Sequence, residues 1–306
     1  MIEKVPSDLA RIFDRFIVTE YAYFTPKGEP LCWPVTPYWN PNKNIISIAT
    51  GLAYPTKADY AKKNPKVALL FSASKGSGLP DSTHVLVQGD ATVRDENIQE
   101  NTDRYVSEMR RKFPQARLAL NGLTVKMLDF YLPRLWVEVS PVRIISGAGS
   151  GRSVIGPPLP EPVAEQAHDS KPLPRDELAA LFKVASKEET GVLTMKGGDG
   201  YPYMQRVYCA PARDRLEIDA APASGPACLT LHHHSLAGTR FSAYLARGAV
   251  LEEGGRHFFV PRRLVGFFGN GAVFPLSVIP SVRNLRKRLR KELAKRDQPM
   301  PILRVP

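Results

Sequence analysis

Two threonines and a lysine stand where an expected strand leads into an expected helix. Thr50 ends the apolar strand at 45–50, and Thr56 and Lys57 open the helix that follows it. Hydroxyl and ammonium donors at a strand end and a helix N-terminus can converge on an anion, and the helix dipole adds to the attraction. This pattern is compatible with a phosphate site but does not by itself predict one. The alternative is a solvated helix lysine beside an ordinary β-branched strand residue.

A run of three histidines is the second place where side chains could do chemistry. On a strand, His232 and His234 face one way and His233 the other. Two imidazoles on one face could ligate a metal or a haem, or polarise a substrate carbonyl near neutral pH. No third ligand is indicated, so we assign no metal. The alternatives are a polar strand end or a buried, hydrogen-bonded imidazole.

The composition is that of an ordinary globular protein with a basic excess. The 306 residues include 42 Lys or Arg and 30 Asp or Glu, which gives a net charge of +12, and 43% are hydrophobic. These values exclude a chain that is disordered throughout and suggest roughly two domains. The charge raises nucleic acid, anionic lipid or a polyanionic ligand as partners. The 28 prolines favour turns, strand edges and linkers over a mostly helical fold.

The cysteines and the N-terminal residues indicate in which cellular compartment the protein is expected. Cys32, Cys209 and Cys228 share no C-x-x-C spacing and leave one unpaired, so the sequence indicates neither a disulfide framework nor a zinc site. Charged residues interrupt the N-terminus where a secretory signal would be apolar, and no stretch approaches the ~18 apolar residues of a membrane span. We therefore expect a cytoplasmic protein with no transmembrane segment.

A stretch rich in glycine and proline divides the chain. Residues 147–174 contain four Gly and six Pro with little apolar periodicity, a composition typical of a linker. It separates a first domain at 1–146 from a second at 175–280, which a basic segment at 281–306 follows.

The two halves repeat one pattern in one order. Amphipathic helices at 7–17 and 175–186 begin them, and each continues with a hairpin and further short strands. Residues 64–74 match 225–235, residues 84–96 match 241–253, and residues 136–147 match 257–268. These matches place Gly89 on Gly248, Gln88 on Arg247 and Pro141 on Pro261. Matched blocks in a preserved order predict a duplication.

The strand pattern predicts the fold class. Short strands without βαβ alternation favour a small antiparallel barrel in each half, so we expect an α+β, mainly β, protein of two tandem barrels with flanking helices. The first half alone has helical inserts, at 98–113 and 123–132.

The first half resembles the flavin-binding split-barrel family typified by pyridoxamine 5'-phosphate oxidase. The resemblance rests on ISIATGLAYPTKADYAKKNPKVALLF (46–71), in which Asn64-Pro65 follows Lys57 by seven residues, and on VLVQGDATV (85–93). It covers about 10–147 and, more faintly, 176–268. It implies split barrels and FMN as cofactor, with the phosphate at Thr50, Thr56 and Lys57.

The resemblance also implies where the flavin ring would lie. Family members offer backbone amides near the positions of Val35 and Thr36, and polar side chains where this chain has His84 and Gln88. Pro34 and Pro37 remove ladder donors, so this strand should lie at a sheet edge where a ligand can replace a neighbour. The alternative for His84 and Gln88 is an ordinary exposed strand position.

One departure separates the chain from the type enzyme. Thr56 stands where pyridoxamine phosphate oxidases carry Arg, and their C-terminal Arg and His motif is not evident. We therefore do not expect that enzyme's own activity. Because some family members bind a deazaflavin coenzyme and others bind or degrade haem, both remain alternatives to FMN.

The second half has lost the helix that carries the lysine. Between Ala220 and Gly225 only APAS remains, too short for a helical turn and its connections. The second barrel should therefore hold no flavin phosphate. Because family members dimerise with the cofactor between barrels, we expect an intramolecular pseudo-dimer with one site, a homodimer being the alternative. Arg247 would then meet an acidic substrate or a phosphate, and His232 and His234 a substrate.

Most of the excess charge lies in the basic segment. Residues 281–306 contain nine Lys or Arg and two Asp or Glu. A helix here would place Val282, Leu285, Leu289 and Leu293 on one stripe, which we expect to pack on a barrel while the cations face water. The alternatives are binding to a polyanion or membrane surface, or closure over an acidic ligand. No motif supports nucleic-acid recognition.

Together these features predict an FMN-dependent oxidoreductase acting on a small molecule, with no catalytic acid or base assigned. The alternatives are a deazaflavin-dependent reductase and a non-catalytic flavin- or haem-binding module.

Overall fold

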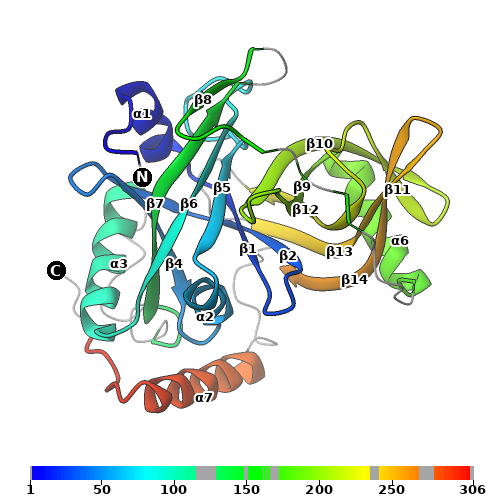
Figure 1. Ribbon diagram of the computed structural model, residues 1–306. Coiled ribbons are helices and arrows are strands. Elements are labelled where there is room, and N and C mark those ends of the chain that lie inside the picture. Colours follow the sequence, from blue (N-terminus) through cyan, green and yellow to red (C-terminus); the bar gives the residue numbers. More distant parts are fainter. Residues whose placement is uncertain are drawn as a thin grey trace.

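The computed structural model shows two β-units side by side (Figure 1). It describes residues 2–114, 129–147, 151–160, 162, 164–165, 172–234, 241–268 and 279–303. The first unit is built on an eight-stranded curled sheet and the second on a closed six-stranded barrel. The prediction of a mainly β protein with two tandem barrel-like units and flanking helices is confirmed.

The first unit contains three helices and eight strands within its described residues. The helices are α1 (Ser7–Arg15), α2 (Thr56–Lys63) and α3 (Ile98–Lys112). The strands are β1 (Thr19–Phe24), β2 (Pro30–Val35), β3 (Pro37–Asn40), β4 (Ile45–Gly51), β5 (Lys66–Phe71), β6 (Val85–Arg94), β7 (Arg134–Ser146) and β8 (Ser153–Ile155). Most of the helix expected at 123–132 lies outside the described residues, and 129–132 form turns.

The second unit begins with a helix and continues with six strands. The helix is α6 (Arg175–Glu188). The strands are β9 (Thr190–Lys196), β10 (Pro202–Ala212), β11 (Arg215–Ile218), β12 (Gly225–His234), β13 (Phe241–Glu253) and β14 (Arg256–Phe268).

The two sheets follow the same strand order. The first runs β2-β1-β5-β6-β7-β4-β3, and the second runs β10-β9-β12-β13-β14-β11 and returns to β10. The continuous β10 pairs with both β9 and β11 and closes the second barrel. In the first unit the equivalent strand is divided at Thr36 into β2 and β3, beside Pro37, which has no N–H to donate. The topology is thus that of a duplication.

The ladder also corrects one block of the sequence match. Val67 faces Gly89 in the first unit, and Ala227 faces Gly248 in the second. Residues 64–74 therefore correspond to 224–234, one residue away from the predicted match with 225–235.

The strongest local sign of duplication is a glycine facing a proline. Gly89 faces Pro141 and Gly248 faces Pro261, and each glycine directly follows a register shift. A Cβ on either glycine would collide with a backbone carbonyl of the neighbouring strand, that of Ser140 or Val260. Both positions therefore require glycine for close approach of the strands.

We expect Gly89→Ala to lower the free energy of unfolding by about 1–3 kcal/mol, because the added methyl group must displace a strand backbone. Urea denaturation measures the change. Gly151→Ala is the control, since nothing lies within 4 Å of a Cβ there. Equal stability of the two variants would contradict this steric argument.

A shared apolar cluster joins the units. Its buried members from the first unit include Ala22 and Cys32, and those from the second include Met204 and Cys228. All three cysteines are buried free thiols. The predicted contact between the two barrels is therefore present within one chain.

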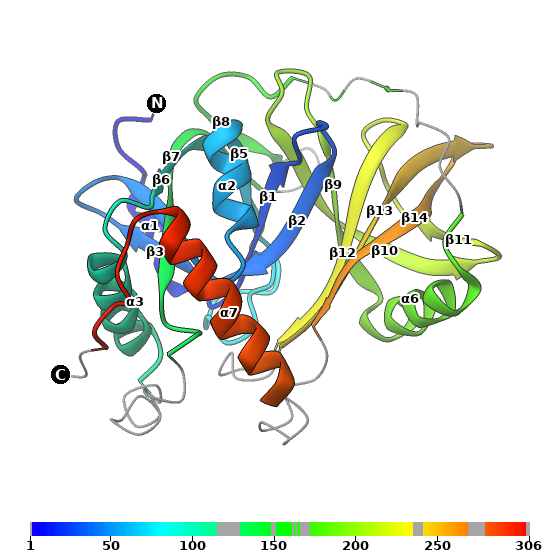
Figure 2. The same ribbon diagram turned by 90° about the horizontal axis from the view of Figure 1, so that it is seen from below.

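The C-terminal helix α7 (Ile279–Lys295) returns to the first unit and lies near α2 (Figure 2). Leu289 and Leu293 are buried in that unit's core, and Val282 and Leu285 pack against it. Just beyond the helix, the Arg296 guanidinium lies 2.9 Å from the Asp59 carboxylate of α2. The predicted apolar stripe thus packs on the first barrel unit. In the described part of the chain, no helix combines the length and apolar character needed to cross a membrane.

Candidate functional site

The helix α2 presents Lys57 at its second position, close to the start of the helix. The Lys57 ammonium lies 4.8 Å from the centre of the Trp33 ring on β2. Burial, together with the charge of Arg134, lowers the pKa of Lys57 to about 8. Among the described residues Lys57 forms no ion pair, so its charge is not balanced by a carboxylate.

A second cation, Arg134, lies at the start of β7, where it faces Gly51 at the end of β4. Its guanidinium lies 4.2 Å from the centre of the Tyr105 ring and 4.0 Å from that of Tyr131. Its Nη2 donates a hydrogen bond to the Tyr105 hydroxyl at 3.0 Å. The side chain is buried, yet its Nε has no hydrogen-bond partner in the described part of the chain. Arg134 therefore keeps an unused donor.

The backbone at the start of α2 adds further donors. The amides of Ala58 and Asp59 donate to the Pro55 carbonyl, at 2.8 and 2.9 Å. Within the described residues, no backbone acceptor is found for the amides of Thr56 and Lys57, as is usual for the first turn of a helix. These amides, two cations and the exposed Thr56 hydroxyl make this region a candidate anion site.

Thr50, the third residue predicted for the phosphate site, has its hydroxyl engaged within the protein. It is buried, and its hydroxyl donates a hydrogen bond to the Tyr54 carbonyl at 3.1 Å. That bond spans the turn between β4 and α2. In this structure Thr50 fixes the turn that presents Lys57, and Thr56 has the hydroxyl exposed to solvent.

The strand predicted to bind a flavin ring ends close to this site. Val35 faces Thr19 of β1 at the end of β2, and Thr36 belongs to neither β2 nor β3. As expected, β2 and β3 occupy the two ends of the sheet path. The second barrel lies against β2, since the Thr230 hydroxyl donates to the Cys32 carbonyl at 3.1 Å.

The barrel interface holds a buried polar cluster that includes one of the predicted histidines. The Glu20 carboxylate of β1 is fully buried and lies 2.8 Å from Nη2 of Arg206 and 2.7 Å from Nε2 of His232. The Ser72 hydroxyl donates to it at 3.3 Å. His232 thus contacts a carboxylate of the other unit. Burial lowers the pKa of His84, while the negative charge of the nearby Glu20 acts in the opposite direction. Nδ1 of His84 has no hydrogen-bond partner among the described residues.

The remaining predicted residues join the two barrels. The Gln88 amide donates to the Pro202 carbonyl at 2.8 Å and accepts from Arg143. Arg247 donates to the Glu29 carboxylate at 2.7 Å, and Nε2 of His234 lies 3.1 Å from the Lys75 carbonyl. The predicted set is therefore distributed over four places: the start of α2, the end of β2, the Glu20 cluster and the interface pairs. No group of three or more potential metal ligands occurs among the described residues.

Sequence reasoning missed Arg134, Trp33, Glu20 and Arg206. Arg134 follows Pro133 at the start of an apolar strand, far along the chain from Lys57. A single arginine or glutamate next to an apolar run carries no periodic signal, and only strand pairing reveals its neighbours. For Glu20, the one available signal was a carboxylate within a run whose other members are Thr, Tyr, Ala and Phe.

No protein-family model and no curated protein matches the chain. Several solved structures are similar to it. One is a pyridoxamine 5'-phosphate oxidase-related, FMN binding protein from Nostoc punctiforme, with 11% identity over 67% of this chain and 98% of that chain, and a TM-score of 0.35. Another, from Clostridium acetobutylicum, is related to general stress protein 26 of the pyridoxinephosphate oxidase family, with 9% identity over 49% and 92%, and a TM-score of 0.34. A third is Campylobacter jejuni ChuZ, with 14% identity over 49% and 58%, and a TM-score of 0.36.

Proposed function

We propose that this chain is an FMN-dependent oxidoreductase that binds the coenzyme phosphate at the start of α2. The observation that carries the proposal is the pair of cations Lys57 and Arg134, which lie near each other without a carboxylate partner among the described residues. Two neighbouring cations repel each other unless an anion lies between or beside them. Unused amide donors at the same helix end complete a site suited to a dianionic phosphate.

The residues present fit this coenzyme. Lys57 and the unused Nε of Arg134 would bind the phosphate, together with the amides of Thr56 and Lys57 and the Thr56 hydroxyl. The backbone at Val35 and Thr36 would orient the ring, and the second barrel, packed on β2, would exclude water from it. When bound, FMN supplies the redox chemistry that the side chains here cannot perform.

The second barrel holds no equivalent site in this proposal. The connection between β11 and β12 covers only residues 219–224, whereas the one between β4 and β5 includes α2. We therefore propose one coenzyme per chain, in a pseudo-dimer formed within the chain, acting on a small-molecule substrate in the cytoplasm. The Glu20 cluster, His234 and Arg247 would serve mainly to join the barrels, because their polar groups contact the other unit.

Purified apo-protein should bind FMN, and binding should weaken as the pH rises through about 8, where Lys57 loses its proton in the absence of an anion. Quenching of flavin fluorescence in a titration measures affinity at each pH. The phosphate is a dianion only above about pH 6, so affinity should be highest between that value and the pKa of Lys57.

Riboflavin, which lacks the phosphate, is the control and should show no such loss above pH 8. An FMN affinity that stays constant through this range would contradict the assignment of Lys57. Parallel titrations with a deazaflavin coenzyme and with haem test the two alternatives, and tighter binding of either would replace the FMN proposal. Reduction of bound FMN by a nicotinamide cofactor would support an oxidoreductase over a non-catalytic module.

A further inference from the structure

In the second barrel, the connection between β11 and β12 occupies the position that α2 has in the first unit, and another part of the chain covers it. In the second unit the strand connection at this point is short, and residues of the segment between the two units lie over it. The Glu165 amide donates to the Ser224 carbonyl at 3.2 Å, and the Glu165 carboxylate lies 3.1 Å from the Lys196 ammonium. Arg143 of β7 donates through Nε to the Pro157 carbonyl at 2.7 Å. The segment is therefore attached at both ends of this crossing.

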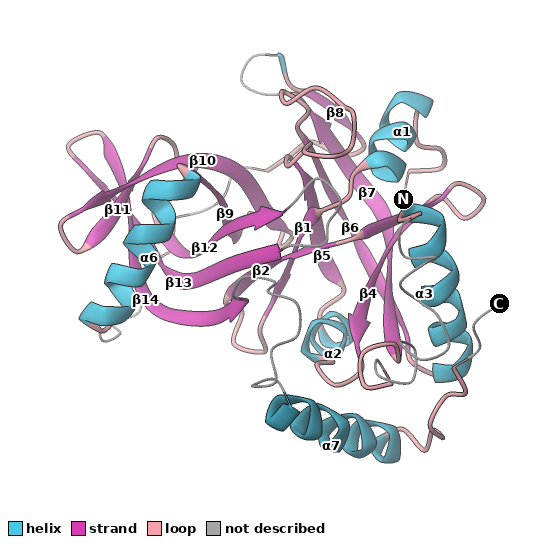
Figure 3. Ribbon diagram, turned by 180° about the vertical axis from the view of Figure 1, so that it is seen from behind, coloured by secondary structure: helices cyan, strands magenta, loops and turns pink. Residues whose placement is uncertain are grey.

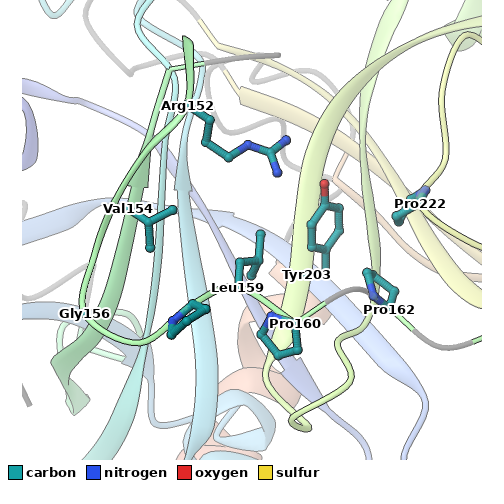
Figure 4. Close-up of a pocket in the computed structure, with 9 residues that line it drawn as sticks. Arg152, Val154, Gly156, Leu159, Pro160, Pro162, Tyr203 and Pro222 are labelled. Atoms are coloured by element: carbon teal, nitrogen blue, oxygen red, sulfur yellow. The ribbon is translucent and has the colours of Figure 1, made fainter. Parts of the chain in front are cut away.

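Between this segment and the second barrel lies a cavity of about 720 Å³. Figure 4 shows Arg152, Val154 and Leu159 on one side and Tyr203 and Pro222 on the other, with Pro162 beside Pro222. The described residues that line it are Arg152, Val154, Gly156, Pro158, Leu159, Pro160, Pro162, Tyr203 and Pro222. This volume is typical of small-molecule sites.

The cavity is distinct from the proposed coenzyme site. Its wall includes the strand β8, which lies at the opposite end of the molecule from α2 in Figures 1 and 3. None of its lining residues belongs to the site at Lys57. The cavity and the phosphate site therefore share no lining residue.

The lining points to one class of ligand. Proline rings, Leu159 and the face of the Tyr203 ring form flat apolar walls. Arg152 extends its guanidinium into the cavity (Figure 4) and forms no ion pair or hydrogen bond with any other described residue. Among the described lining residues it is the one with a charged side chain. A guanidinium that pairs with no other described residue, at one end of a cavity with both polar and apolar walls, suits a planar molecule with a single carboxylate.

We propose that this cavity binds a small aromatic carboxylate, with the carboxylate on Arg152 and the ring between the prolines and Tyr203. The Tyr203 hydroxyl donates to the Gln205 amide oxygen at 3.1 Å, which fixes the ring that forms this wall. Because walls come from both units, occupancy would also stabilise the contact between the barrels.

Isothermal titration of the full chain with 2-naphthoate tests the proposal. We expect binding, with affinity reduced roughly 10-fold or more by Arg152→Met, since a charge-assisted hydrogen bond is lost. Arg11→Met, which removes an exposed arginine of α1, is the matched control and should bind like the natural chain. The uncharged 2-naphthylmethanol should bind weakly to the natural chain and equally weakly to Arg152→Met.

A second variant adds a negative charge at the rim without touching the core. Val154 is 40% exposed, so Val154→Glu should fold normally and weaken naphthoate binding more than naphthylmethanol binding. Lys57→Met should leave naphthoate binding intact, which separates this cavity from the coenzyme site. Absence of naphthoate binding to the natural chain, or equal affinity in Arg152→Met, would overturn the proposal.

Discussion

Replacing Lys57 by methionine should weaken FMN binding by roughly 10- to 100-fold, because a charge-assisted hydrogen bond to the phosphate contributes about 1.5–3 kcal/mol. The apo-protein should not lose stability. The Lys57 ammonium is partly buried beside Arg134, which disfavours its charged form, and methionine keeps the length of the side chain without that charge. Loss of coenzyme binding in a normally folded protein would therefore mark a binding residue.

Flavin fluorescence titration and urea denaturation of the same preparations measure the two quantities. Lys63→Met is the matched control, because Lys63 is an exposed lysine at the other end of the same helix. Its FMN affinity should equal that of the natural chain. Riboflavin affinity should be similar in all three proteins, and an equal loss for riboflavin and FMN in Lys57→Met would show that the phosphate is not the group Lys57 contacts.

The sequence contained enough information to predict the duplication because its signals were local. Gly89 and Pro141 in one half, and Gly248 and Pro261 in the other, marked equivalent positions of the two copies before any strand pairing was known. The apolar stripe around Leu289 likewise indicated packing of the C-terminal helix. Each of these patterns follows from the geometry of one strand or helix.

Contacts between distant segments could not be predicted in the same way. Arg134 lies near Lys57 only because β7 pairs with β4 and brings its first residue beside the turn before α2. The resemblance implied Gln88 as a flavin contact, yet its amide bonds to the Pro202 carbonyl of the other unit. Sequence patterns indicate which face a side chain occupies, but the partner across an interface depends on how two folded units pack.

The Glu20 cluster shows how the two copies have diverged. Glu20 faces Leu70 in the first unit, and at the equivalent ladder position of the second unit Val192 faces Thr230. The second copy thus has an apolar residue where the first has a buried carboxylate. That carboxylate finds its partners in the second unit, at Arg206 and His232.

Replacing Glu20 by valine should lower the free energy of unfolding by about 3–5 kcal/mol, because removal of this carboxylate leaves the partly buried guanidinium of Arg206 uncompensated. Glu20 is fully buried, and it accepts from both Arg206 and His232 across the interface. Chemical denaturation measures the loss. Glu253→Ala, which breaks the pair with Arg215 on the surface, is the control and should change the stability far less, because water screens an exposed ion pair.

The natural chain should also show the pH dependence of this carboxylate. Burial alone would raise the pKa of Glu20, but the hydrogen bond from His232 and the charge of Arg206 outweigh it and hold the pKa below 4.5. Since the folded state therefore binds the proton less readily than the unfolded state, the stabilisation is present above that pH and is lost as the pH falls below it. In Glu20→Val this part of the acid-induced loss should be absent.

A double variant separates the uncompensated charge from simple loss of packing. Glu20→Val combined with Arg206→Leu removes both charges and fills the space with apolar groups, an exchange that is often neutral in buried pairs. The double variant should therefore be more stable than Glu20→Val alone, with a coupling energy of about 1–3 kcal/mol. If the losses in free energy of unfolding from the two single changes simply added up, the Glu20–Arg206 pair would not stabilise the contact between the barrels. The apolar cluster around Cys32 and Cys228 would then be the main source of that stabilisation.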